Sequence, residues 1–158
     1  MKKTIAVIIA IIFLFAAFWL GEEGKGLFQV WPYLFGLVVI TVIPSLVWKK
    51  WAYRIFYCFL CTIFSMAAFY MGGLSFSRAY DSCLEEAEQV RTALSDYEVK
   101  NGKYPDVLDD LNMKLPCSRY LRGTILKYEN TASDYRIWFK DWLVEHSATA
   151  KEPFLAHK

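Results

Sequence analysis

The sequence predicts a membrane protein: three N-terminal transmembrane α-helices followed by a small α+β domain with a long helix packed on a short antiparallel β-sheet. The first observation behind this prediction is a set of three apolar stretches, none with a charge across its centre. Each approaches or exceeds the length that a helix needs to cross a hydrocarbon core about 30 Å thick. They are Thr4 to Leu20, Leu27 to Trp48 and Ile55 to Met71.

The second observation is a change in composition after Gly72-Gly73. From Leu74 onward the chain contains twelve Lys or Arg and fourteen Asp or Glu residues, so it is nearly balanced and slightly acidic. No basic stripe is present, so no nucleic-acid partner is expected. We therefore expect a lipid-embedded anchor over residues 1–73, an exported domain over 74–146 and a flexible tail over 147–158.

The orientation follows from the basic residues near the spans. Lys and Arg gather before the first span and between the second and third, whereas the loop Gly21–Gly26 has one Lys against two Glu. By the positive-inside rule, the N-terminus is cytoplasmic and the C-terminal domain lies across the membrane. A cleaved signal peptide is the alternative for the first span, but Trp19 and Leu20 stand where small residues should precede a cleavage site.

The cysteines form two separate pairs. Cys83 and Cys117 are the only two in the exported half, where a disulfide would help a small core; the alternative is two buried free thiols. Cys58 and Cys61 lie in the middle of the third span, without the helix N-terminus or the water that makes such thiols reactive. We expect them to be packing residues.

The exported half begins with a predicted amphipathic helix, from about Ser77 to Lys100. Its apolar positions recur at steps of three and four, and Asn101-Gly102 then ends it because Gly accepts a left-handed turn. The Asn101-Gly102-Lys103-Tyr104-Pro105 turn and the following Leu108 and Leu111 resemble the family of type IV pilins and type II secretion pseudopilins. Here Tyr104 is expected to cover the helix end and Pro105 to start a short helix.

The resemblance continues into a predicted β-hairpin, Gly123–Tyr128 and Tyr135–Phe139, around a polar turn. In its second strand Tyr135, Ile137 and Phe139 alternate with polar neighbours, as in a half-buried strand. The resemblance implies a bacterial inner-membrane protein with a periplasmic pilin-like domain. However, the third span lacks the Gly that prepilin peptidase cleaves and the Glu that directs pilin assembly, so a shared function does not follow.

No residue pattern indicates catalysis, a metal or a cofactor. His146 and His157 are isolated, and no serine has the context of a nucleophile elbow. Asp106, Asp109 and Asp110 have the oxygen ligands that Ca²⁺ takes, but acids at the start of a short helix ordinarily complement its dipole. Because these catalytic patterns are missing, we do not expect an enzyme. We do not expect a transporter either, because no charged residue lies in the middle of a predicted span.

Recognition of another protein is the remaining role. Trp138, Trp142 and Tyr120 are the candidate binding residues because large exposed aromatics are enriched at hot spots; for Trp142 a place in a further core strand is the alternative. The expected function is an accessory or assembly factor of a pilus or secretion machine. The alternatives are an immunity protein against a periplasm-acting toxin, and membrane helices that act themselves. A homo-oligomer through those helices is left open.

Overall fold

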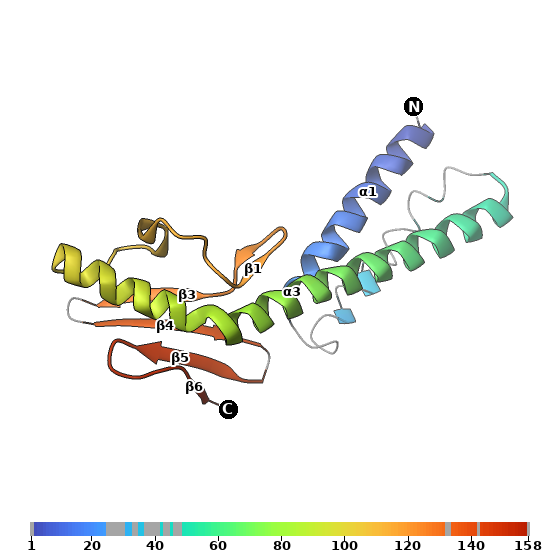
Figure 1. Ribbon diagram of the computed structural model, residues 1–158. Helices are drawn as coiled ribbons and strands as arrows, with labels where there is room; N and C mark the ends of the chain where they lie inside the picture. The colour runs from blue at the N-terminus through green and yellow to red at the C-terminus, as the bar shows by residue number, and fades with distance from the viewer. Residues whose placement is uncertain are drawn as a thin grey trace. The chain divides into compact units, whose positions relative to one another are not determined.

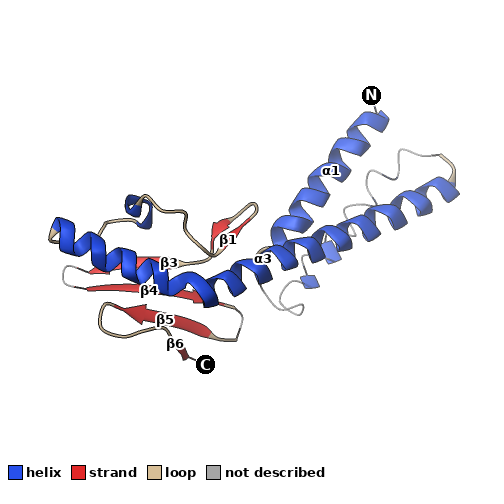
Figure 2. Ribbon diagram, in the orientation of Figure 1, coloured by secondary structure: helices blue, strands red, loops and turns tan. Residues whose placement is uncertain are grey.

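A computed structural model describes residues 2–24, 31–32, 35–36, 42, 45, 49–131, 134–141 and 143–157. The chain divides into two compact units, Met1–Phe76 and Ser77–Lys158. Helices α1 (Lys2–Gly21) and α3 (Trp51–Asn101) are followed by a short 3₁₀ helix, η1, and six strands (Figure 1). Figure 2, coloured by type, shows the strands of the second unit lying along the C-terminal half of α3. The predicted long helix on a small antiparallel sheet is confirmed.

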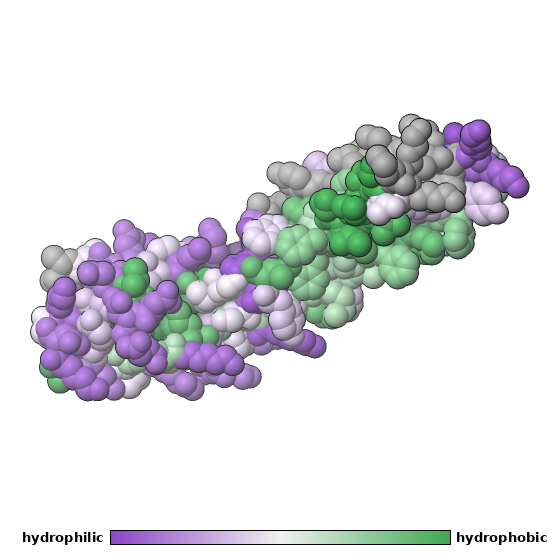
Figure 3. All heavy atoms as spheres, turned by 90° about the horizontal axis from the view of Figure 1, so that it is seen from above, coloured by the Kyte–Doolittle hydropathy of each residue, from purple (hydrophilic) through white to green (hydrophobic). Residues whose placement is uncertain are grey.

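Among the residues that the structure describes, two helices, α1 and α3, are long and apolar enough to cross a membrane. Their apolar side chains are largely exposed in the first unit, unlike those of a core helix in a soluble protein. Hydrophobic side chains gather over this unit on the face drawn in Figure 3, whereas hydrophilic ones cover the second unit. The second predicted span, Leu27 to Trp48, lies mostly outside the described residues.

In the first unit, α1 approaches α3 closely at two glycines. A Cβ on Gly21 would collide with the carbonyl oxygen of Phe69, and one on Gly72 would collide with the carbonyl oxygen of Phe18. Such approach of backbones through small residues is how helices associate in lipid, where burial of apolar surface drives nothing. Tyr57 adds a hydrogen bond from its hydroxyl to the carbonyl oxygen of Ala6, at 3.2 Å.

The predicted third span and the predicted amphipathic helix both lie in one continuous helix, α3, which runs through Gly72 and Gly73. A glycine inside a helix costs about 1 kcal/mol, which strongly helical neighbours on both sides offset. Gly72 also has a reason to be small, since α1 lies against it. The helix ends at Asn101, and Gly102 takes the left-handed conformation at φ 71°.

The second unit places one face of α3 on a four-stranded antiparallel sheet in the order β3-β4-β5-β6. The strands are β3 (Lys127–Thr131), β4 (Asp134–Lys140), β5 (Glu145–Thr149) and β6 (Leu155–His157). The core is formed by buried residues of α3 and of the facing sheet: Cys83, Ala87, Val90, Leu94, Tyr135, Ile137, Phe139 and Ala148. The period-two pattern of β4 is therefore confirmed.

A smaller hairpin precedes this sheet. Strand β1 (Ser118–Arg119) pairs with β2 (Gly123–Thr124), so the first predicted hairpin strand, Gly123–Tyr128, is split between β2 and β3. The Cys83–Cys117 disulfide is present, with 4.9 Å between the Cα atoms, and it joins α3 to the segment that enters this hairpin. The predicted bond is confirmed, and Cys58 and Cys61 are free.

Two expectations fail in this unit. The tail over 147–158 is not a loose extension, because most of β5 and all of β6 lie in it, and Ala148 is buried against the core. Pro105 does not start the short helix, since η1 runs from Leu108 to Leu111. The Pro105 carbonyl instead accepts hydrogen bonds from Tyr128 at 2.7 Å and Asn130 at 3.0 Å, and only backbone outside a helix leaves that carbonyl open to them.

Candidate functional site

The outer face of the four-stranded sheet is the candidate recognition surface, and β4 sets its centre. Because side chains alternate along a strand, Arg136, Trp138 and Lys140 lie opposite the buried Tyr135, Ile137 and Phe139. The strand register carries the same face across the sheet. Beside Trp138 lie Lys127 on β3 and Ser147 on β5, and Ser147 pairs in turn with Leu155 on β6.

Trp138 is half-buried and held by a charged neighbour. The Arg136 guanidinium carbon lies 5.2 Å from the centre of the indole ring, within the range of a cation–π contact. The same guanidinium forms an ion pair with Glu145, at 2.7 Å, across β4 and β5. The Arg136 side chain is 51% exposed and the Glu145 side chain 30%, so the pair stabilises the sheet by about 0–1 kcal/mol while it holds Arg136 near the ring.

The other two candidate aromatics are not on this face. Tyr120 lies in the turn between β1 and β2, where 70% of it is exposed, and its hydroxyl accepts a hydrogen bond from Arg78 of α3 at 3.0 Å. Trp142 falls outside the described residues. The alternative for Trp142, a further core strand that would include Leu143 and Val144, finds no strand at those two residues, since β5 begins at Glu145. The sequence thus identified one residue of the outer face and missed its partners, Arg136 and Glu145.

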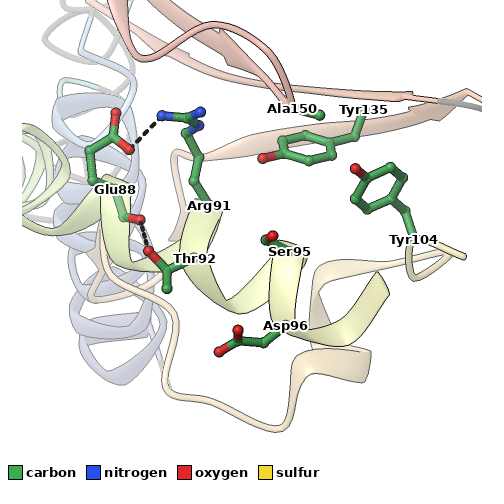
Figure 4. Close-up of a pocket in the computed structure, with 8 residues that line it drawn as sticks. All are labelled: Glu88, Arg91, Thr92, Ser95, Asp96, Tyr104, Tyr135 and Ala150. Carbon is green, nitrogen blue, oxygen red and sulfur yellow. Dashed lines mark hydrogen bonds and ion pairs between the residues drawn. The ribbon is translucent and has the colours of Figure 1, made fainter. Parts of the chain in front are cut away.

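A pocket of 280 Å³ opens between α3 and the core side of the sheet (Figure 4). The two tyrosine rings that line it, Tyr104 and Tyr135, meet edge to face with centroids 4.9 Å apart. Arg91 reaches in from α3, donating to the Thr149 carbonyl oxygen at 3.2 Å and to Glu88 at 2.7 Å. Because the Arg91 charge is already bonded within the chain, we regard it as a structural link between α3 and β5.

The protonation of these groups agrees with a structural role. Burial raises the pKa of Tyr104 and of Tyr135, although Arg91 opposes the effect at Tyr135, so both hydroxyls stay protonated at neutral pH. Burial lowers the pKa of Arg91, but its hydrogen bonds to Glu88 and Tyr135 outweigh that and raise it. The two tyrosines therefore present neutral hydroxyl groups to the pocket.

In the described part of the chain, the two histidines lie apart from each other and from the acidic residues of η1. His146 stacks on the buried Phe139, with ring centroids 5.0 Å apart, and His157 lies at the exposed end of β6. Among the described residues, no group of three or more His, Cys, Asp or Glu side chains is placed to hold a metal ion. Asp109 and Asp110 lie in the first turn of η1, where acids complement the helix dipole.

Comparison with known proteins found no relative of this chain. No family model matches the chain, and neither curated proteins nor solved structures include a match.

Proposed function

We propose that this chain is a non-enzymatic membrane protein whose exported domain binds another envelope protein, as an accessory or assembly factor of a pilus or secretion machine. One observation carries the proposal. The helix α3 is both a candidate membrane span and the helix on which the antiparallel sheet packs, and it ends in the Asn101–Pro105 turn. A helix that leaves the membrane and continues into a small sheet domain is the arrangement that the resemblance to pilins implies.

The position outside the cytoplasm is part of the proposal. It is supported by the positive charges at residues 2, 3, 49, 50 and 54. The Cys83–Cys117 disulfide supports it independently, because such bonds persist in oxidising compartments. A reporter attached after His157 tests it: activity of a reporter that works only outside the cytoplasm is expected, and activity confined to a cytoplasmic reporter would reverse the topology.

The recognition surface in this proposal is the outer face around Trp138. A tryptophan whose ring contacts an arginine presents a large apolar area and has less side-chain entropy left to lose on binding. Both residue types are enriched at hot spots, where truncation costs 2 kcal/mol or more. We therefore expect Trp138→Ala to weaken partner binding by about 30-fold. Val107→Ala is the matched control, because Val107 is an exposed apolar residue outside the sheet.

The test is photo-crosslinking in the native membrane, with a benzophenone amino acid at Lys140 on the outer face and, as a control, at Val99 on α3, which is 79% exposed. Adducts at Lys140 with pilins or secretion-machine subunits, lost in the Trp138→Ala background, are the expected result. Equal adducts at both positions would remove the outer face from the proposal.

An immunity protein against a periplasm-acting toxin is the second candidate. It is favoured by the absence, before the third span, of the processing Gly and the assembly Glu that pilins carry. In the crosslinking experiment, capture of a single toxin domain at Lys140 in place of envelope machinery would establish this second function. The membrane helices would become the functional part only if neither class of partner were captured.

A further inference from the structure

The pocket between α3 and the sheet carries polar side chains that have no partner in the described part of the chain. Ser95 and Asp96 line it from α3, and Tyr104 lines it from the turn that follows. Neither the two α3 side chains nor the Tyr104 hydroxyl forms a hydrogen bond or ion pair with a described residue. In Figure 4 the Ser95 side chain and the hydroxyls of Tyr104 and Tyr135 point into one space. These groups are therefore available to a ligand.

The walls of the pocket are fixed by contacts that leave those groups unused. One carboxylate oxygen of Asp134 accepts the Tyr135 amide at 2.7 Å and the Ala150 amide at 3.1 Å, so it joins two walls of the pocket. The Tyr104 ring is held edge to face against the Tyr135 ring, which is buried. Because these walls are in place before a ligand arrives, binding loses little conformational entropy of the protein.

The charges that line the pocket disfavour an anionic ligand. Arg91 is the one cation among the described lining residues, and its guanidinium already donates to the Thr149 carbonyl oxygen and to the Glu88 carboxylate. Two carboxylates, those of Glu88 and Asp96, line the same pocket and would repel an anion. An apolar ligand is disfavoured for another reason, since it would leave the hydroxyls of Ser95 and Tyr104 unpaired. A neutral, polar ligand remains.

We propose that this pocket binds a single neutral sugar ring, either of a free sugar or at the end of a glycan. Sugar hydroxyls both donate and accept, which suits the hydroxyls of Ser95 and Tyr104 and the Asp96 carboxylate. The C–H face of a sugar ring is apolar and packs on an aromatic ring such as that of Tyr104. The volume of 280 Å³ lies just below the lower end of ligand pockets, about 300 Å³, so the pocket admits only a small ligand.

Saturation-transfer NMR on the full-length protein in lipid nanodiscs measures this binding without detergents that carry sugar headgroups. The probes are glucose, galactose, mannose and N-acetylglucosamine, and we expect saturation transfer to the ring protons of at least one. For that sugar, Ser95→Ala and Tyr104→Phe should each weaken the Kd by about fivefold, because each removes one hydrogen bond. Two controls outside the pocket, Val99→Ala on α3 and Trp138→Ala on the outer face, should leave the Kd unchanged.

Two comparisons of ligands sharpen the test. The sugar that binds is compared with its uronic acid, whose added carboxylate should weaken the Kd by about fivefold, and Asp96→Asn should narrow that difference. The same sugar is then compared with its linear trisaccharide. A trisaccharide that binds at least as tightly identifies the end of a glycan as the ligand, whereas binding that is lost on extension identifies a free sugar.

Absence of transfer to every probe sugar, or transfer that Ser95→Ala and Tyr104→Phe leave unchanged, would overturn the inference. It would also be overturned if these two variants weakened capture of a protein at Lys140 and had no effect on sugars, because the pocket would then belong to a protein interface. The inference is independent of the proposed function, since Trp138→Ala tests only the latter. Maleimide reactivity confined to Cys58 and Cys61 shows that each variant keeps its disulfide.

Discussion

Reducing the Cys83–Cys117 bond is expected to destabilise the second unit strongly. The bond closes a loop with a sequence separation of 34, and both half-cystines are fully buried. In the chain-entropy description, closing a loop of this length restricts the unfolded chain by about 13 cal/mol/K, which is about 4 kcal/mol at 25 °C. Because small domains have only about 5–15 kcal/mol of total stability, this one bond accounts for a large share.

The assay is urea unfolding of the full-length protein in mild detergent, followed by brief proteolysis of the unfolded fraction. With a urea slope of about 1 kcal/mol/M for a domain of this size, a reductant should lower the midpoint by about 4 M, or unfold the unit without urea. The Cys58→Ala, Cys61→Ala variant is the matched control, since these thiols are free and lie outside the unit. A reduced protein whose midpoint falls by less than about 0.5 M would refute the reasoning.

Three further outcomes are expected. Gly72→Val forces a Cβ into the α1 backbone and should lower the stability of the detergent-solubilised protein by about 1–3 kcal/mol, measured by thermal unfolding. Gly73→Val is the control, because a Cβ there meets nothing within 4 Å. Equal effects of the two substitutions would contradict the close approach of the helices. Phe139→Ala should lower the free energy of unfolding by about 3–5 kcal/mol, because Phe139 is on the buried face of β4. Lys140→Ala, on the exposed face, should lower it by less than about 0.5 kcal/mol, and a reversed order would contradict the assignment of the two faces. Burial raises the pKa of Tyr128 to about 12, so its stabilising effect is complete below about pH 10 and is lost as the pH rises through 12. Tyrosinate absorbance should therefore lose a group that titrates near pH 12 in Tyr128→Phe, and an unchanged titration in that range would reject this.

The sequence predicted those parts of the fold that a periodic pattern defines. The stripe of Cys83, Ala87, Val90 and Leu94 repeats at helical spacing, and these residues form the helix side of the core. The alternation in β4 likewise located the central strand and, through it, the outward position of Trp138. In both elements one face is buried, so the physical cause of the pattern, burial on one side, is local enough to be visible in the sequence.

The missed features depend on contacts that no local pattern encodes. Strand β6 consists of three exposed residues, and it is ordered by pairing with β5 and by the nearby Phe154, whose ring lies 5.5 Å from that of Phe139. Glu22, expected in a polar loop, is fully buried and accepts a 2.6 Å hydrogen bond from Ser75, a residue 53 positions later. A composition-based reading assigns such segments to tails and loops, because their partners lie elsewhere in the chain.

The order of strands in the four-stranded sheet has a consequence for how this chain is made. Strands β4, β5 and β6 each pair with the strand before them in the sequence, so each has its partner ready as it arrives. Hairpins form in about 1–10 μs, whereas synthesis delivers about 5–20 residues per second, so pairing keeps pace with delivery. Helix α3 is delivered first and offers the surface on which the strands collect. Strand β6 therefore joins a sheet that is already paired and does not initiate its folding, and removal of β6 should leave a late, nearly finished intermediate in place of an unfolded chain.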